Sequence, residues 1–165
     1  MKVILYKTKH GSTLDVANMI SENLGDCTLM ELKSADKATL ESADSIIIGV
    51  PVYFGKLEQD MVKFINDNKD LFTSKNCSMY VTGVMPADFM KFVNQSLDSS
   101  IINHMKVLSG VGGMLRFKEL TISDKMILQV MNQHFSIMSN QDTNVFDNLD
   151  KNEIQSFCEK VKNIA

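Results

Sequence analysis

The sequence predicts an α/β protein with a doubly wound, five-stranded parallel sheet and helices on both faces. Short continuous apolar runs, typical of strands buried on both faces, alternate with longer stretches whose apolar residues recur at helical spacing. The helical stretches are amphipathic rather than apolar all round, as covering helices are. Because strand and helix alternate repeatedly, the strands are expected to lie parallel.

The elements follow in a regular order. Five strands are expected at residues 3–6 (VILY), 27–32, 45–50 (SIIIGV), 77–84 and 105–111. The second alternates apolar and polar residues, which predicts a more exposed strand. Five helices are expected at residues 12–24, 57–72, 87–102, 123–138 and 151–164. Gly25 can end the first helix, because glycine readily forms a left-handed C-cap.

Composition limits the class of protein. The 165 residues, 44% of them hydrophobic, suit a single domain over residues 1–165. No apolar run is long enough to cross a bilayer and no signal peptide is recognised, so a cytoplasmic protein is expected. A net charge of −3 without a basic stripe argues against nucleic acid. Three scattered cysteines favour small buried side chains over disulfides, and no metal site is predicted.

Ligands of such sheets bind at the carboxyl ends of the strands, near the point where strand order reverses. Four loops are therefore candidates: residues 8–13, 51–56, 84–88 and 112–121. In the first loop, Gly11 directly precedes a helix, whose free N–H groups suit a phosphate. Thr8, Ser12 and Thr13 add hydroxyl donors. In the alternative interpretation, Ser12 or Thr13 simply caps the helix.

Other phosphate-binding patterns do not fit. The first loop lacks the first glycine and the Lys-Ser/Thr pair of a Walker A loop, and it lacks two glycines of the dinucleotide fingerprint. A second glycine cluster, Gly110, Gly112 and Gly113, follows the fifth strand rather than the first, and we interpret it as a turn. A receiver domain is rejected because its acidic residues are missing from the ends of strands one and three.

The stretch TKHGST (residues 8–13) resembles the flavodoxin phosphate loop, [ST]-x-T-G-x-T, which wraps the phosphate of FMN. Thr8, Gly11 and Thr13 match, whereas His10 replaces a threonine. The run from residue 46 to 65 resembles the third strand, flavin-contacting loop and following helix of that family. The resemblance covers nearly the whole chain and implies strand order 2-1-3-4-5 with FMN as cofactor.

A closer resemblance is to the flavodoxin-like menaquinone-dependent protoporphyrinogen dehydrogenases. Phe54-Gly55 matches an aromatic-glycine pair in their flavin loop. GMLRF (113–117) and the methionine-bearing stretch 124–140 match their C-terminal region, which electron-transfer flavodoxins lack. The stretch 84–104 matches poorly. The resemblance implies electron transfer from a protoporphyrinogen-like substrate to a quinone.

Three segments are expected to contact FMN. They comprise Thr8, Lys9, His10, Gly11, Ser12 and Thr13 around the phosphate; Pro51, Val52, Tyr53, Phe54, Gly55 and Lys56 beside the flavin; and Thr82, Gly83, Val84 and Met85. Tyr53 and Phe54 are candidates for stacking on the ring, and Gly55 lets a peptide turn toward the flavin N5. Lys56 and Lys9 either add positive charge at the cofactor or are solvated surface lysines. No catalytic residue is assigned.

Two features leave alternatives open. Arg116 either pairs with a substrate carboxylate or forms an ion pair with Glu119 or Asp124. The helix expected at 123–138 has one broad apolar face, which either covers the sheet or contacts a quinone, a membrane or a partner. That face comprises Met126, Ile127, Val130, Met131, His134 and Met138.

Three functions are consistent with this sequence. The first is an FMN oxidoreductase that passes electrons from a reduced substrate to a quinone. The second is an electron carrier that serves a redox protein partner and has no substrate of its own. The third is a flavodoxin-fold binding protein without FMN. Carriers tend to be strongly acidic, and the mild net charge of −3 favours the enzyme. The sequence does not predict the oligomeric state.

Overall fold

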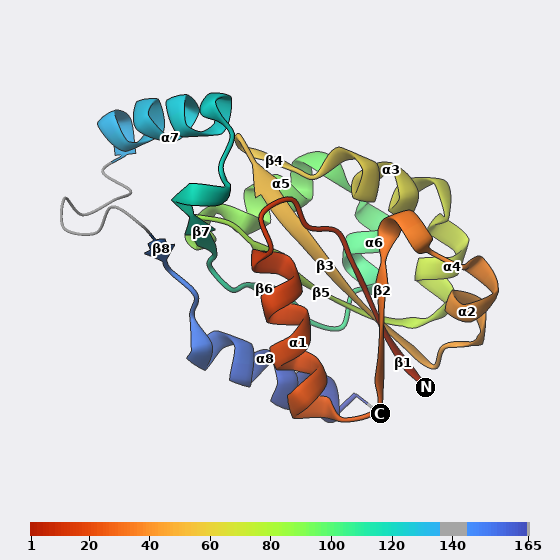
Figure 1. Ribbon diagram of the computed structural model, residues 1–165. Helices are drawn as coiled ribbons and strands as arrows, with labels where there is room; N and C mark the ends of the chain where they lie inside the picture. Colours follow the sequence, from red (N-terminus) through yellow and green to blue (C-terminus); the bar gives the residue numbers. More distant parts are fainter. Residues whose placement is uncertain (136–144, 165) are drawn as a thin grey trace.

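A parallel sheet forms the centre of the computed structural model, which describes residues 1–135 and 145–164, with side chains up to residue 130 and from 145 to 164 (Figure 1). Its strand order is β2-β1-β3-β5-β6. The strands are β1 (Lys2–Tyr6), β2 (Cys27–Glu31), β3 (Ser45–Tyr53), β5 (Asn76–Thr82) and β6 (Leu108–Gly110). Counted along the chain, this order is 2-1-3-4-5, so the predicted fold class and strand order are confirmed. A short β4 (Lys56–Leu57) folds back antiparallel on β3.

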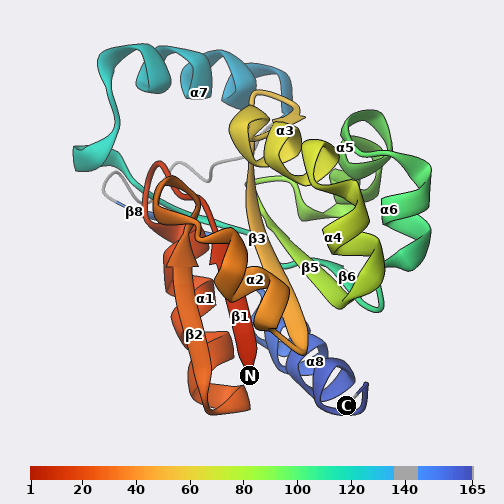
Figure 2. The same cartoon turned by 90° about the vertical axis from the view of Figure 1, so that its right-hand side faces the viewer.

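Two hydrophobic layers flank the sheet because successive strand side chains point to opposite faces. In β1, Leu5 belongs to one buried cluster and Ile4 to the other. The first layer packs beneath α2 (Lys37–Ser42), α3 (Gln59–Asp67), α4 (Lys69–Ser74), α5 (Phe89–Ser96) and α6 (Ser99–His104), and the second beneath α1 (Ser12–Leu24) and α8 (Lys151–Lys162). Figures 1 and 2 show these helix layers on opposite sides of the sheet.

Two stretches expected as single helices are interrupted. The stretch 57–72 splits into α3 and α4 at Asn68, where the backbone leaves the helical conformation with φ −113° and ψ 35°, and where the side-chain amide also donates to the Phe64 carbonyl at 2.8 Å. The stretch 87–102 begins with a 3₁₀ turn, η2 (Pro86–Asp88), and then splits into α5 and α6. Leu97 is extended there, and the Asp98 carboxylate accepts from the Ser100 N–H, so a new helix begins.

A small two-stranded sheet replaces part of the loop expected at 112–121. There β7 (Met114–Arg116) pairs antiparallel with β8 (Val145–Asp147). The 3₁₀ turn η3 (Phe117–Glu119) follows β7, and another, η1 (Leu32–Ser34), follows β2. The expected fifth strand is shorter than predicted, because only Leu108–Gly110 pairs with β5. Among the described residues, no helix is long and apolar enough to cross a membrane.

The helix expected at residues 123–138 is α7 (Ile122–Phe135), and it does not cover the sheet. It lies beyond the carboxyl ends of the strands (Figures 1 and 2), and Ile122, Met126 and Val130 are 79%, 63% and 53% exposed. The interpretation of its apolar face as core is therefore wrong for Met126 and Val130. The reason is that α1 and α8 already fill the adjacent sheet face. The side chains of Met131 and His134, and all of Met138, lie outside the described part.

Candidate functional site

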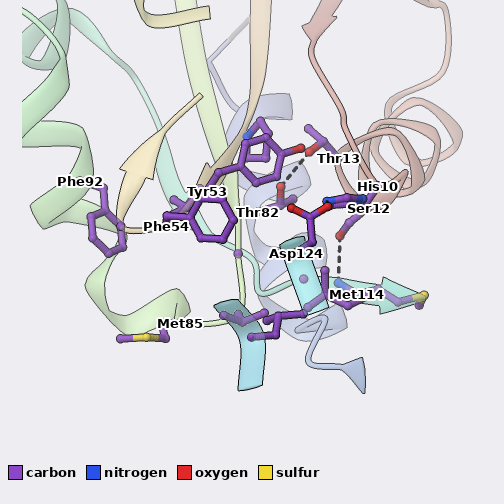
Figure 3. A pocket seen from close by; sticks show the side chains of 18 of the residues that line it. His10, Ser12, Thr13, Tyr53, Phe54, Thr82, Met85, Phe92, Met114 and Asp124 are labelled. Atoms are coloured by element: carbon purple, nitrogen blue, oxygen red, sulfur yellow. Dashed lines mark hydrogen bonds and ion pairs between the residues drawn. The ribbon is translucent and has the colours of Figure 1, made fainter. Parts of the chain in front are cut away.

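A cavity of about 490 Å³ opens at the carboxyl ends of the strands, where ligands of such sheets bind. The segments predicted from the sequence meet there, and Figure 3 shows their side chains around it. Three of the predicted residues, Lys9, Gly11 and Lys56, do not line the cavity. The other predicted residues line it: Thr8, His10, Ser12, Thr13, Pro51, Val52, Tyr53, Phe54, Gly55, Thr82, Gly83, Val84 and Met85. Lys56 is an exposed strand residue.

The loop at residues 8–13 is bent around Gly11, which has a left-handed φ of 87° and forms the N-cap of α1. Its N–H donates to the Thr8 hydroxyl at 2.9 Å, which fixes the bend. Within the described chain, no side chain caps this helix, so the interpretation of Ser12 or Thr13 as a simple N-cap is wrong. The helix therefore presents N–H groups and its positive dipole end beside the cavity, an arrangement that favours an anion.

The hydroxyls of this loop tie it to two other segments (Figure 3). Ser12 Oγ accepts from the Met114 N–H at 3.0 Å, so its own proton is free to donate elsewhere. Thr13 and Thr82 are buried, and their hydroxyl oxygens lie 2.8 Å apart. The loop is thus held against the end of β5 and the start of β7.

Phe54 and Gly55 form the tip of the β3–β4 hairpin. Phe54 and Gly55 both have left-handed φ angles, 50° and 75°, which the two-residue hairpin turn requires. Phe54 adopts its left-handed φ although it is not a glycine, and its side chain is 52% exposed. Backbone strain of this kind is concentrated at functional sites. Tyr53 lies further in, edge-on to the His10 ring with centroids 5.9 Å apart, and burial raises the pKa of its phenol, which stays neutral.

Comparison with known protein families agrees with this geometry. A model of the flavodoxin domain matches residues 3–142. The chain belongs to the flavodoxin-domain family. A flavodoxin from Clostridium saccharobutylicum is 33% identical over 76 residues, which cover 42% of this chain and 48% of the relative. The chain therefore matches about half the length of that curated relative.

Solved structures show the same fold for this flavodoxin-domain chain. A flavodoxin of Streptococcus pneumoniae TIGR4 is similar with a TM-score of 0.59 and 14% identity, covering 99% of each chain. The two-electron reduced flavodoxin of Megasphaera elsdenii is similar with a TM-score of 0.51 and 17% identity, covering 67% of this chain and 85% of the other. At these identities the likeness concerns the fold alone.

Asp124 also lines the cavity of this flavodoxin domain. From the sequence, it was predicted only as an alternative ion-pair partner for Arg116. It is 6% exposed, and Figure 3 shows it beside His10. Its carboxylate accepts from Lys9 Nζ at 3.0 Å and lies 3.5 Å from His10 Nε2. Burial lowers the pKa of His10 despite this carboxylate, so the ring is neutral at pH 7. The Lys9 ammonium also lies 5.7 Å from the Tyr53 ring centroid.

Arg116 does form an ion pair, but with neither expected partner. Its Nη2 lies 2.8 Å from Asp15 Oδ2, on the first turn of α1. This carboxylate raises the pKa of the Arg116 guanidinium through a hydrogen bond. Arg116 is absent from the cavity lining in the described chain, so the geometry favours the structural interpretation over a contact with a substrate carboxylate.

Ten further residues line the cavity that were not among the predicted FMN contacts, although five of them lie in the candidate loops at 84–88 and 112–121. The ten are Asp88, Lys91, Phe92, Gly113, Met114, Leu115, Leu120, Asp124, Ile127 and Leu128. Gly113 is close enough to Gly83 that a Cβ would lie 3.2 Å from the Gly83 backbone, so these glycines do more than form a turn. The glycine pair at 112–113 was the available signal, and it needed the position of Gly83 to be interpreted.

Proposed function

We propose that this flavodoxin-domain protein binds FMN in the cavity and carries electrons between redox partners. The observation that carries the proposal is the uncapped, positive end of α1 beside a cavity whose remaining lining is mostly apolar and aromatic. A cavity of about 490 Å³ lies within the range that holds small-molecule cofactors. A phosphate monoester at one end and a flat apolar ring at the other match those two environments.

The roles of the proposed binding residues follow from their positions. The N–H groups at the start of α1 and the hydroxyl protons of Thr8 and Ser12 would hold the phosphate. Tyr53 and Phe54 would contact the ring, and Met85 lines the same cavity. The Gly55 peptide lies at the hairpin tip, where it can approach the flavin closely. FMN supplies the electron-transfer chemistry, and the protein binds and orients it.

The carrier is supported by family membership and by the site rim. The matched curated relative is a flavodoxin, and the Megasphaera elsdenii flavodoxin is described in a two-electron reduced state. Phe54 is more than half exposed at the rim of the cavity. An exposed aromatic edge beside the ring gives a docking redox protein a short path to the cofactor.

A second candidate is an FMN oxidoreductase with its own substrate, as the resemblance to protoporphyrinogen dehydrogenases implies. The specific observation that favours it is the placement of the GMLRF stretch and the helix after it. Gly113, Met114 and Leu115 line the cavity, as do Ile127 and Leu128 of α7. These residues add an apolar wall that could seat a substrate or a quinone beside the flavin.

Anaerobic electron transfer from the reduced FMN-loaded protein distinguishes the two functions. For a carrier, we expect a one-electron redox protein such as a cytochrome to reoxidise the flavin at least tenfold faster than a soluble menaquinone analogue at equal concentration. The measurement is stopped-flow recovery of oxidised-flavin absorbance. Faster reoxidation by the quinone would reject the carrier and favour the enzyme.

A further inference from the structure

Helix α7 forms a wall of the cavity without packing on the sheet. Ile127 and Leu128 line the cavity, whereas Ile122, Met126 and Val130 are exposed. Figure 2 shows the helix lying across the carboxyl end of the sheet rather than against either face. Among the described side chains, residues 122–130, the exposed Ile122, Met126 and Val130 therefore add little apolar packing between the helix and the rest of the domain.

The polar contacts between the described side chains of α7 and the main body converge on Asp124. One carboxylate oxygen lies 3.0 Å from Lys9 Nζ and the other 3.5 Å from His10 Nε2. The second oxygen also accepts from the Thr121 N–H at 3.3 Å, which fixes the side chain at the start of the helix. Asp124 thus joins the wall helix to the loop at residues 8–13, and Ile127 and Leu128 follow on the next turn.

The same loop carries the anion site of the proposed function. Lys9 and His10 belong to it, and the open N-terminus of α1 follows directly. A phosphate monoester carries about −1.5 to −2 charges at pH 7, more than one carboxylate. An anion held there attracts the Lys9 ammonium and repels the Asp124 carboxylate, in a partly buried setting where charges are weakly screened.

We propose that α7 is a movable wall of the cofactor cavity, latched by Asp124 to Lys9 and to the neutral His10 ring, and that an anion bound by the loop loosens this latch by competing for the Lys9 ammonium. The competition rests on the proposed phosphate site, whereas the latch itself rests on the Asp124 contacts. By linkage, an anion that weakens the latch is itself bound more weakly while the latch is closed. Asp124 is therefore a positioning residue that couples cofactor binding to access.

A tryptophan placed on α7 can report, through its fluorescence anisotropy, whether the contacts of Asp124 hold the helix in place. The chain contains no tryptophan, and Met126 is exposed, so Met126→Trp introduces a single fluorophore on the outer side of the helix. Its fluorescence anisotropy is measured while inorganic phosphate is added. We expect the anisotropy to fall as phosphate binds, because the helix gains freedom. Asp124→Asn in the same background should lower the anisotropy before phosphate is added and raise phosphate affinity about tenfold.

Two further variants complete the test. Lys9→Gln breaks the latch from the loop side and should also lower the starting anisotropy, with circular dichroism showing that each variant folds. Asp67→Asn makes the same charge change in the exposed pair with Lys63 and should leave the anisotropy unchanged. Equal anisotropy in the parent and in Asp124→Asn would overturn the latch. A phosphate-independent anisotropy in the parent would overturn the competition.

The latch and the proposed function fail in different ways. FMN binding, followed separately by quenching of flavin fluorescence, tests the function. Tight FMN binding with no effect of Asp124→Asn on the anisotropy would reject the latch and leave the function intact. Lowered anisotropy in Asp124→Asn without any FMN binding would support the latch and reject the function.

Discussion

A Gly11→Val variant is expected to bind FMN about 100-fold more weakly than the parent, which corresponds to about 2.8 kcal/mol. Gly11 has a φ of 87°, which is a genuine outlier for a β-branched residue. A Cβ at this position would also lie 3.2 Å from Arg116 Nη1, and Arg116 is held by Asp15. The loop would relax to another backbone conformation, and the first N–H groups of α1 would no longer point into the same site.

Gly25→Val is the matched control for this prediction. Gly25 lies at the opposite end of the same helix and also has a positive φ, 64°, but a Cβ at this position would have no neighbour within 4 Å. The substitution should cost about 1–3 kcal/mol of folding stability through backbone strain. It should leave FMN affinity unchanged in the folded protein. Equal losses of affinity in both variants, or none in Gly11→Val, would place the phosphate elsewhere.

A Gly112→Ala variant is expected to lose about 4 kcal/mol of folding stability, the sum of about 2 kcal/mol each from strain and overpacking. Gly112 has a φ of 73°, and a Cβ there would lie 1.8 Å from the Asn148 carbonyl oxygen. That oxygen belongs to the backbone, so it cannot move aside as a flexible side chain would. Because Gly83 N–H donates to the Gly112 carbonyl at 3.0 Å, the distortion would also reach the cavity.

Urea unfolding of Gly112→Ala measures this loss, with Gly25→Ala as the control for strain alone. The control should lose only the strain part, because no atom surrounds its added methyl group. A Gly112→Ala variant as stable as Gly25→Ala would show that the contact between Gly112 and Asn148 relaxes without cost. The close approach of these two segments would then not be needed for the fold.

The strands and the first helix were predictable because their signals are local. Continuous β-branched runs are typical of a buried parallel strand, and α1 spans the predicted residues from Ser12 to Leu24. Position at the strand ends then identified four loops, and each of them contributes residues to the cavity. The alternation of strands and helices and the common direction of parallel strands suffice to place these loops at one edge of the sheet.

The remaining features depend on contacts between distant residues. The pairing of β7 with β8 and the approach of Gly113 to Gly83 join segments far apart in sequence. Asp124 looks like an ordinary acidic residue at a helix start until its distances to Lys9 and His10 are known. Helical periodicity showed that α7 has an apolar face but not what covers it, since the same pattern suits a core helix and a cavity wall.

The most direct test of the central claim compares FMN with riboflavin, which lacks the phosphate group. The cofactor-free protein is titrated with each flavin, and binding is followed by quenching of flavin fluorescence. FMN is expected to bind one to one and at least 100-fold more tightly than riboflavin, because only FMN reaches the positive end of α1. Equal affinity for the two flavins would contradict the phosphate site, and no binding of either would support a flavodoxin-fold binding protein without FMN.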